Sequence, residues 1–531
     1  MNSKLSGKDK SYPTFIRPAT EKIAAQCTAK GQIPHWLEGE VLRNGPGEFE
    51  VGSDKFNHLF DGHAFVHKFT ISGGWVTYTG RFIESNLYKT NKEHNRILCG
   101  GFGTASYTDP CKNIFSRFFT VLTTRPYTDN CNVNVASMAN AHYTITDGGD
   151  VVRFDAEKLE TKNSIALTDI LNVHFSTAHP HYDTNGDYYN LGLTFGRNAF
   201  YNVVRVPASS FNKQDPMQDL EIHAKIEVDT PLQPTYFHSF ALTPNYIVIH
   251  DQPARIDVLK SQWKRIMWQP SSGSITNDMK RQSVFLVVDK KTGNQLPIKF
   301  TSEGRFCFHF INGFEMTTED KRYLLVDMCC HKEPINLQQG IVILDNIRQG
   351  QTTSKITPTF LRFVMPLDIS DSTEEGHNLV NIVGCEATGV MQNDGSIFLT
   401  PESLLKKEFS GTLELPRINY KYNGRKYRYF YAMSVFTPHC EDHLMKCDNI
   451  TKTGITWFEE GCTPSEPVFV ERPGATEEDD GIILSTVINK DPNKSVFLLI
   501  LDAKTFKELA RAEVETNLPI SFHGIFEEKK Q

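Results

Sequence analysis

The stretch HAFVHKFTISGGWVTYTGRF, residues 63–82, decides the fold class of this chain. Aromatic and β-branched residues fill both arms, 63–71 and 75–82, and the glycine pair 73–74 stands between them. Such arms around a glycine turn are typical of a β-hairpin. Short runs of the same kind, punctuated by Gly, Asn and Asp, recur from about residue 40 to the end. The chain is therefore predicted to be mostly β.

A second pattern recurs four times and predicts how the strands are arranged. Each copy is an apolar strand that ends in aspartate and a polar turn: VVRFDAEKLE (151–160), VFLVVDKKTG (284–293), VILDNIRQG (342–350) and FLLILDAKTF (497–506). Because aspartate can accept a hydrogen bond from the backbone of the turn, each copy is typical of the outer hairpin of a propeller blade. The intervals between the copies are uneven, so such a propeller would carry long insertions. No WD or kelch signature is present.

Composition and charge exclude two classes of protein. The 531 residues carry a formal net charge of −7, whereas nucleic-acid-binding proteins are typically basic, so no nucleic-acid partner is expected. No apolar run approaches the roughly 18 residues that a membrane-spanning helix needs. The amino terminus has no apolar signal segment, which predicts a cytoplasmic location. Because no boundary divides residues 21–531, we expect one propeller domain behind a flexible segment at 1–20.

Two segments, 109–126 and 255–270, break the β pattern and combine aromatic residues at helical spacing with lysine and arginine. Such a segment either packs on the domain or lies on a bilayer with its cations near the headgroups. Cys111 is also a candidate for palmitoylation. The candidates for membrane contact or lipidation are Cys111, Phe115, Phe118, Phe119, Trp263 and Trp268.

Three histidines share a setting that is compatible with a common metal site. His238, His309 and His523 each follow a phenylalanine in a short strand-like run, so the ring of the phenylalanine and the imidazole point to opposite faces. A fourth, His179 in TAHPH, precedes a predicted hairpin. The four are too far apart for a zinc finger and would meet only on a propeller axis. They are either metal ligands, suited to zinc, copper, iron or nickel, or ordinary core and surface histidines.

Two glutamates, Glu414 in LELP and Glu466 in PSEP, are lone carboxylates beside apolar residues. Each is either a surface acid or an acceptor for the N–H of a ligand imidazole. No nucleophile elbow, P-loop or dinucleotide fingerprint offers competing chemistry.

Many of these stretches, in one order, resemble the carotenoid cleavage oxygenases, and above all their animal branch of β-carotene oxygenases and retinoid isomerohydrolase. The likeness runs from about residue 13 to 527. The stretches that carry it include LRNGPGEFE (42–50), HLFDGHAFVHKF (58–69), DPCKNIFSRFF (109–119), TAHPHYD (177–183), YFHSFALTPNYIV (236–248), FHFINGFE (308–315), LELPRINY (413–420), PSEPVFV (464–470) and EEDDGIILS (477–485).

The resemblance implies a seven-bladed β-propeller with a helical or loop cap over an axial Fe²⁺. It further implies that Glu414 and Glu466 orient two of the ligands, while the glutamate expected for His238 falls on Asp147. Aspartate is one methylene shorter, so either a water or backbone shift remakes that contact or the register differs there. Thr146 and Phe102 match positions beside the substrate. The implied iron ligands are His179, His238, His309 and His523.

The implied activity is oxidative cleavage of one double bond of a carotenoid or apocarotenoid by O₂, which gives apocarotenoid or retinal aldehydes. Two alternatives stay open: isomerohydrolysis of a retinyl ester on the same iron scaffold, and a carotenoid-binding protein without activity. A carotenoid is almost insoluble in water, so such an enzyme has to draw it from a bilayer. The family pattern therefore assigns segments 109–126 and 255–270 to peripheral membrane contact. The sequence leaves the oligomeric state open, with a homodimer as the candidate assembly.

Overall fold

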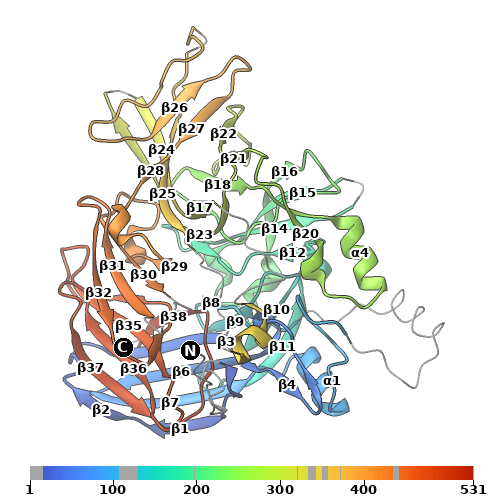
Figure 1. Cartoon of the computed structure of the whole chain (residues 1–531), viewed down its shortest axis with the longest axis vertical. Helices are drawn as coiled ribbons and strands as arrows, with labels where there is room; N and C mark the ends of the chain where they lie inside the picture. Colours follow the sequence, from blue (N-terminus) through green and yellow to red (C-terminus); the bar gives the residue numbers. More distant parts are fainter. Residues whose placement is uncertain are drawn as a thin grey trace, which may run out of the picture.

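The computed structural model describes residues 16–106, 129–196, 198–319, 321–332, 342–349, 357–370, 372–434 and 442–529, apart from the side chain of Arg265. In this part of the chain, seven sheets of four to six strands follow one another in a ring (Figure 1). Each of these sheets is called a blade below, numbered in chain order. Two further sheets, β4 (Glu50–Val51) with β5 (Asp54–Lys55) and β19 (Ala254–Ile256) with β20 (Ile275–Asn277), have two strands each.

Blades 1 to 4 take most of their strands from the first 302 residues. Blade 1 contains β1 (Lys22–Gln26), β3 (Gly39–Glu48), β6 (His63–Ser72), β7 (Trp75–Phe82) and β38 (His523–Glu528). Blade 2 contains β8 (Asn134–Met138), β9 (Ala141–Ile145), β10 (Asp150–Phe154) and β11 (Thr161–Ala166). Blade 3 contains β12 (Phe175–Ser176), β13 (His181–Tyr182), β14 (Tyr188–Thr194), β15 (Phe200–Val206) and β16 (Glu221–Glu227). Blade 4 contains β17 (Ala241–Leu242), β18 (Tyr246–Asp251), β21 (Ser283–Asp289), β22 (Phe300–Ser302), β26 (Thr388–Met391) and β27 (Ile397–Thr400).

Blades 5 to 7 complete the ring. Blade 5 contains β23 (Phe306–Thr318), β24 (Lys321–His331), β25 (Thr359–Pro366) and β28 (Glu402–Ser403). Blade 6 contains β29 (Leu413–Arg417), β30 (Tyr429–Ser434), β31 (His443–Asp448) and β32 (Thr453–Phe458). Blade 7 contains β2 (Thr28–Gly31), β33 (Cys462–Pro464), β34 (Val468–Glu471), β35 (Gly481–Asn489), β36 (Val496–Asp502) and β37 (Glu508–Val514).

The hairpin predicted at 63–82 forms β6 and β7. Ser72 pairs with Trp75, so Gly73 and Gly74 make a two-residue turn, and their φ angles are +57° and +79°. Positive φ at both central residues is the mark of a type I′ turn, which glycine adopts without steric cost. The prediction of a mostly β chain is confirmed.

Three of the four aspartate-ended copies end a strand that pairs with the next strand along the chain, β10 with β11, β21 with β22 and β36 with β37. The β10–β11 pair is the outermost of its blade, as predicted, whereas β27 and β26 lie beyond β22 and β2 lies beyond β37. The carboxylates of Asp155, Asp289 and Asp502 accept hydrogen bonds from the backbone N–H three residues later, at 2.9, 2.8 and 2.6 Å. The prediction is wrong for VILDNIRQG, where Leu344–Arg348 forms helix α5. There Asp345 lies in the first helical turn, where a negative charge is favourable, so a short apolar run before aspartate suits a helix as well as a strand.

Strands from both ends of the described chain close the ring. In blade 1, β38 pairs with β3 and places His523 opposite Asn44. In blade 7, β2 pairs with β37 and places Thr28 opposite Glu513. Blades 1 and 7 therefore each contain strands from both chain ends.

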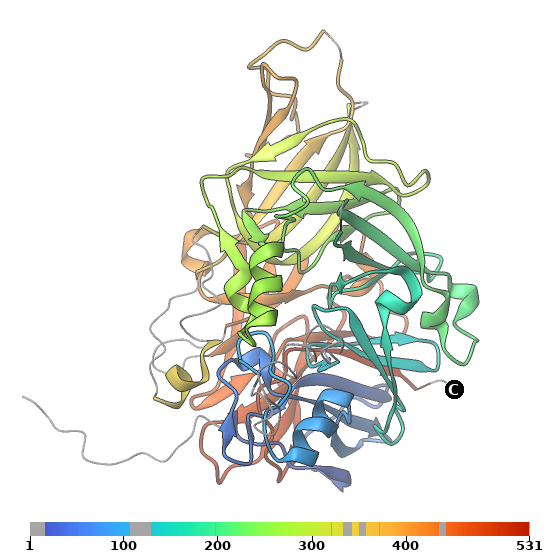
Figure 2. The ribbon, with the colours of Figure 1, turned by 90° about the vertical axis from the view of Figure 1, so that its right-hand side faces the viewer.

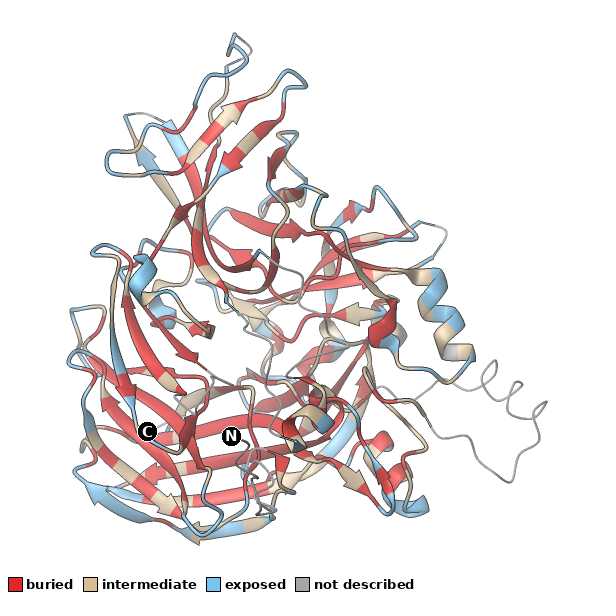
Figure 3. Cartoon of the chain, in the orientation of Figure 1, coloured by how far each residue is buried: buried red, intermediate tan, exposed pale blue. Residues whose placement is uncertain are grey.

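The apolar core lies mainly between neighbouring blades, where the ribbon is coloured as buried (Figure 3). Phe69 of blade 1, for example, packs in one cluster with Leu498 of blade 7. A smaller cluster joins Phe56, Leu344 of α5 and Ile520, with Phe522 packed against it. It holds α5 and the loop around residue 56 over blades 1 and 7, which is a cap of the predicted kind.

The described helices are few and peripheral: α1 (Asn86–His94), α3 (Leu167–Leu171), α4 (Val258–Ile266) and α5. Helix α4 lies on the outside of the ring in both views (Figures 1 and 2). Among the described helices, none is long and apolar enough to cross a bilayer. The expectation of one domain over 21–531 stays a prediction.

Candidate metal centre

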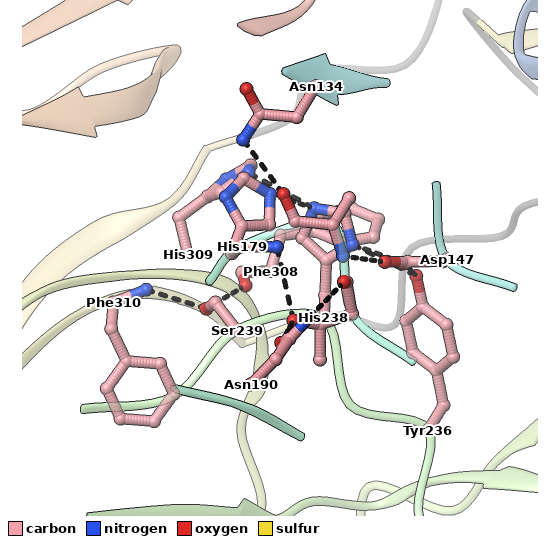
Figure 4. A network of polar contacts seen from close by, with 12 residues as sticks. Asn134, Asp147, His179, Asn190, Tyr236, His238, Ser239, Phe308, His309 and Phe310 are labelled. Carbon is pink, nitrogen blue, oxygen red and sulfur yellow. Dashed lines mark hydrogen bonds and ion pairs between the residues drawn. The ribbon is translucent and has the colours of Figure 1, made fainter. Parts of the chain in front are cut away.

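The structure brings the four predicted histidines together on the axis of the ring. His179 lies between β12 and β13, His238 precedes β17, His309 lies on β23 and His523 begins β38. One ring nitrogen of each lies within 4.8 Å of those of the others. Figure 4 shows His179, His238 and His309 pointing toward one another.

Burial and mutual contact keep three of these imidazoles, His179, His309 and His523, neutral. The Nε2 atoms of His179 and His238 are 2.9 Å apart, and those of His238 and His309 are 3.2 Å apart. Burial lowers the pKa of His523 to about 4, and burial together with the neighbouring histidines holds the pKa of His179 well below its usual value. Burial likewise lowers the pKa of His309, so at neutral pH His179, His309 and His523 offer lone pairs rather than charges.

Three carboxylates fix the tautomer of three of these histidines. Nδ1 of His309 lies 2.8 Å from Oε2 of Glu414, and Nδ1 of His523 lies 2.8 Å from Oε1 of Glu466. Nδ1 of His238 contacts Oδ2 of Asp147 directly, without a bridging water. Because Nδ1 carries the donated proton, the lone pair is on Nε2 and faces the axis. The shorter Asp147 thus reaches its histidine.

Each carboxylate also accepts from one backbone N–H and one further side chain. Asp147 accepts from Ala178 N at 3.0 Å and from the Tyr236 hydroxyl at 2.7 Å. Glu414 accepts from Leu415 N at 3.0 Å and from His331 Nε2 at 2.7 Å. Glu466 accepts from Gly524 N at 3.1 Å and from Arg417 Nη1 at 3.4 Å.

These contacts keep the two glutamates ionised. Burial alone would raise the pKa of Glu466, but Arg417 and His523 lower that pKa to about 2. Burial would likewise raise the pKa of Glu414, but His309 and His331 hold it well below its usual value.

Sequence reasoning missed the three outer donors, Tyr236, His331 and Arg417. Tyr236 and Arg417 lie inside the quoted stretches YFHSF and LELPRINY, so they could have been selected. His331 follows Cys329-Cys330 at the end of β24, and no motif in the sequence marks it as part of the site.

One residue of the centre comes from each blade. In blade order they are His523, Asp147, His179, His238, His309, Glu414 and Glu466. Nitrogen lone pairs that converge on one point repel one another, and a divalent transition metal ion relieves that repulsion. The donor set, four imidazoles surrounded by three carboxylates, therefore fits such an ion.

A cavity reaches the centre, and a series of aromatic ring contacts leads to it from Phe102. A cavity of about 490 Å³ is lined by His179, His309 and Glu466 and extends to Tyr420. The ring centroids of Phe102 and Phe60 lie 6.2 Å apart, and those of Phe60 and Phe522 lie 5.5 Å apart. Phe522 is the neighbour of His523 in the sequence.

Thr146, the other residue expected beside the substrate, is half-buried next to Asp147. The rings of Phe60 and Phe522 thus stand between Phe102 and the centre, and the position of Phe102 and Thr146 beside a substrate stays a prediction.

Residues 16–528 match the family described as "Retinal pigment epithelial membrane protein", which is the family of the carotenoid oxygenases. The chain belongs to the carotenoid oxygenase family. Similar members include the "Carotenoid-cleaving dioxygenase, mitochondrial" of Mustela putorius furo, 39% identical over 97% of this chain and 95% of that relative. The "Beta,beta-carotene 15,15'-dioxygenase" of Mus musculus is 37% identical over 95% of this chain and 89% of the relative.

Solved structures of carotenoid oxygenases agree with the fold. A mutant of the Synechocystis apocarotenoid oxygenase matches with a TM-score of 0.76 at 19% identity, over 97% of this chain and 98% of that one. A chimera of that oxygenase gives a TM-score of 0.76, also at 19% identity, over 99% of this chain and all of the chimera. Because these structures are seven-bladed propellers, the predicted fold is confirmed.

Proposed function

We propose that this carotenoid oxygenase binds Fe²⁺ and uses O₂ to cleave one double bond of a carotenoid of the β-carotene type. The convergence of four imidazoles, with one ring nitrogen of each within 4.8 Å of the others, carries the proposal. The relatives at 37 to 39% identity are named as dioxygenases, which supports this reaction over isomerohydrolysis.

The chain's own residues prepare the reaction. Bound iron would supply the activation of O₂. Asp147, Glu414 and Glu466 hold the Nδ1 protons of three imidazoles and so aim the Nε2 lone pairs at the axis. Phe102, together with Phe60, offers aromatic walls that hold a polyene and exclude water. Both oxygen atoms of O₂ end in the products, one in each aldehyde, so no external reductant is required.

Helix α4 is the proposed membrane contact within the described residues. Leu259, Trp263 and Met267 recur every four residues and are 64%, 63% and 51% exposed. Lys260 and Lys264 lie on the same helix, so aromatic, aliphatic and cationic side chains are combined as in an interfacial helix. Trp268, just after the helix, is half-buried.

The position of α4 favours direct transfer of substrate from the bilayer. The chain that leaves α4 returns to the Phe102 loop, where Ser272 N donates to the Phe102 carbonyl at 2.7 Å. A membrane-bound α4 would therefore place the aromatic approach beside the lipid. The second predicted segment, 109–126 with Cys111, Phe115, Phe118 and Phe119, lies outside the described residues.

Cleavage under ¹⁸O₂ tests the function. Iron-loaded protein with β-carotene in detergent should yield aldehydes with ¹⁸O in both products, and His309→Ala should abolish turnover. A retinyl ester that gives a cis alcohol without O₂ uptake would establish isomerohydrolysis instead. If the protein binds several carotenoids and cleaves none of them, it is a carotenoid-binding protein without activity.

Two predictions about location and assembly accompany the proposal. Peripheral membrane association in the cytoplasm is expected, whereas the names of some relatives include "mitochondrial", so cell fractionation decides the compartment. The homodimer stays a prediction, which light scattering of the purified protein checks.

A further inference from the structure

The outer donors of the three carboxylates differ in chemical kind. The Tyr236 hydroxyl donates a hydrogen bond to Asp147, and the charged Arg417 guanidinium donates one to Glu466. The donor to Glu414 is the imidazole N–H of His331. The distances, 2.7, 3.4 and 2.7 Å, make the contacts of Tyr236 and His331 the closer ones. The imidazole of His331 therefore interacts strongly with a carboxylate that holds a metal-site histidine.

The His331 contact crosses from one blade to the next. His331 ends β24 of blade 5 and lies opposite Phe306 of β23, the strand that also carries His309. Glu414 comes from β29 of blade 6. The side chains of His331, Glu414 and His309 are only 4%, 13% and 10% exposed, so water cannot readily replace a lost partner.

The two oxygens of Glu414 have separate tasks. Oε2 accepts from His309 Nδ1 and Leu415 N, whereas the contact described for Oε1 is that of His331 Nε2. Donors on both oxygens prevent the carboxylate from turning about its last bond. Without His331, the Glu414 carboxylate would lose this donor, and it could turn away from His309 toward another one, such as the nearby Cys329 thiol.

We propose that His331 is a positioning residue, which fixes the Glu414 carboxylate and through it the orientation of the His309 imidazole at the metal centre. The neutral imidazole suffices, because Nε2–H is the donor. The inference depends on the metal centre of the proposed function but not on its reaction.

The test compares two variants of His331 with a matched control. His331→Phe keeps a buried ring and removes the donor, whereas His331→Gln keeps an amide N–H near the place of Nε2. The control is His250→Phe in blade 4. His250 is also buried on a strand, stacks on Phe285, and has no hydrogen-bond partner among the described residues.

Metal affinity is measured by anaerobic competition of Fe²⁺ with a chelator, and the visible spectrum of the Co²⁺-loaded protein reports the ligand field. For His331→Phe we expect the Kd for Fe²⁺ to rise about 10- to 100-fold, the usual effect of losing an outer-shell partner, with an altered Co²⁺ spectrum. His331→Gln and His250→Phe should stay within about threefold of the wild type in Kd. KM for the carotenoid should not change in any variant.

Three results would overturn the inference. The first is a wild-type Kd and Co²⁺ spectrum for His331→Phe. The second is an equal loss of Fe²⁺ affinity in His331→Gln and His331→Phe, and the third is an equal loss of affinity in His250→Phe.

A fourth result that would overturn the inference concerns the number of bound ions, because Cys329, His331 and Glu414 also have ligand atoms within 4.8 Å of one another. If the wild type held two ions and His331→Phe one, His331 would be a ligand of a second ion. Absence of carotenoid cleavage alongside the expected Kd values would contradict the proposed function and leave the role of His331 intact.

Discussion

Replacing Asp147 by asparagine isolates the contribution of one carboxylate to the metal centre. Oδ2 of Asp147 accepts from the Tyr236 hydroxyl and from His238 Nδ1, and Oδ1 accepts from Ala178 N. An amide has one oxygen, so in its better orientation it keeps the first two donors and turns its NH₂ toward Ala178 N–H. The smallest loss is one charge-assisted hydrogen bond, about 1.5 to 3 kcal/mol, which corresponds to about 10- to 150-fold in an equilibrium constant.

We expect this loss to appear in the binding of the metal. The amide oxygen introduced by Asp147→Asn still accepts from His238, but repulsion between its NH₂ and Ala178 N–H displaces the side chain and turns His238 with it, so the Kd for Fe²⁺ should rise about 10- to 150-fold. Competition with a chelator under anaerobic conditions measures the Kd, and circular dichroism checks the fold.

A matched control is Asp187→Asn. Asp187 is a buried aspartate of blade 3 whose carboxylate accepts from Arg205 and from Ala208 N. The Asp187→Asn substitution should leave the Kd for Fe²⁺ unchanged. A folded Asp147→Asn protein with the affinity of the wild type would refute the reasoning, because the carboxylate would then contribute nothing to the orientation of His238.

Three further predictions concern the cap and the membrane. A Cβ on Gly103 would lie 2.4 Å from Cβ of His58, so Gly103→Ala should destabilise the protein to urea by about 1 to 3 kcal/mol through overpacking. Burial raises the pKa of Asp61 to about 6 from 3.8, so the folded state binds this proton more tightly. Stability should therefore fall by up to about 3 kcal/mol as pH rises from about 4 to 6, and Asp61→Asn should flatten that part of the urea-unfolding profile. Trp263→Ser should lower sedimentation with liposomes severalfold, whereas Trp75→Ser, which removes a 71% exposed tryptophan from blade 1, should not.

Local chemistry explains why so much of the fold could be predicted from the sequence. The glycines 73–74 and the aspartates at 155, 289 and 502 act within a few residues of themselves, so a short stretch determines the turn that each one makes. Asp345 marks the limit of that reasoning, because an aspartate after three apolar residues also suits the first turn of a helix. Only the packing of Leu344 against Phe56 distinguishes the two.

The site was less accessible to reasoning from the sequence. Alternation along a strand indicated that His238, His309 and His523 could face one interior. Glu414 and Glu466 stood out as lone carboxylates, but only the family resemblance assigned them to the ligand histidines. His331 escaped both approaches, because its hydrogen bond joins two blades and depends on where their strands end.

Closure of the propeller and assembly of the metal centre are one event. His523 begins β38, whose pairing with β3 closes blade 1, and its carboxylate partner Glu466 comes from blade 7, which β2 completes. Because every blade gives one residue to the centre, no subset of blades can form it, and detachment of β38 removes a ligand. An ion held there binds only the closed ring, so its binding free energy adds to the stability of closure. The centre therefore serves the fold as well as the chemistry, and the buried carboxylates that aim its histidines also join blade 2 to blade 4, blade 6 to blade 5 and blade 7 to blade 1.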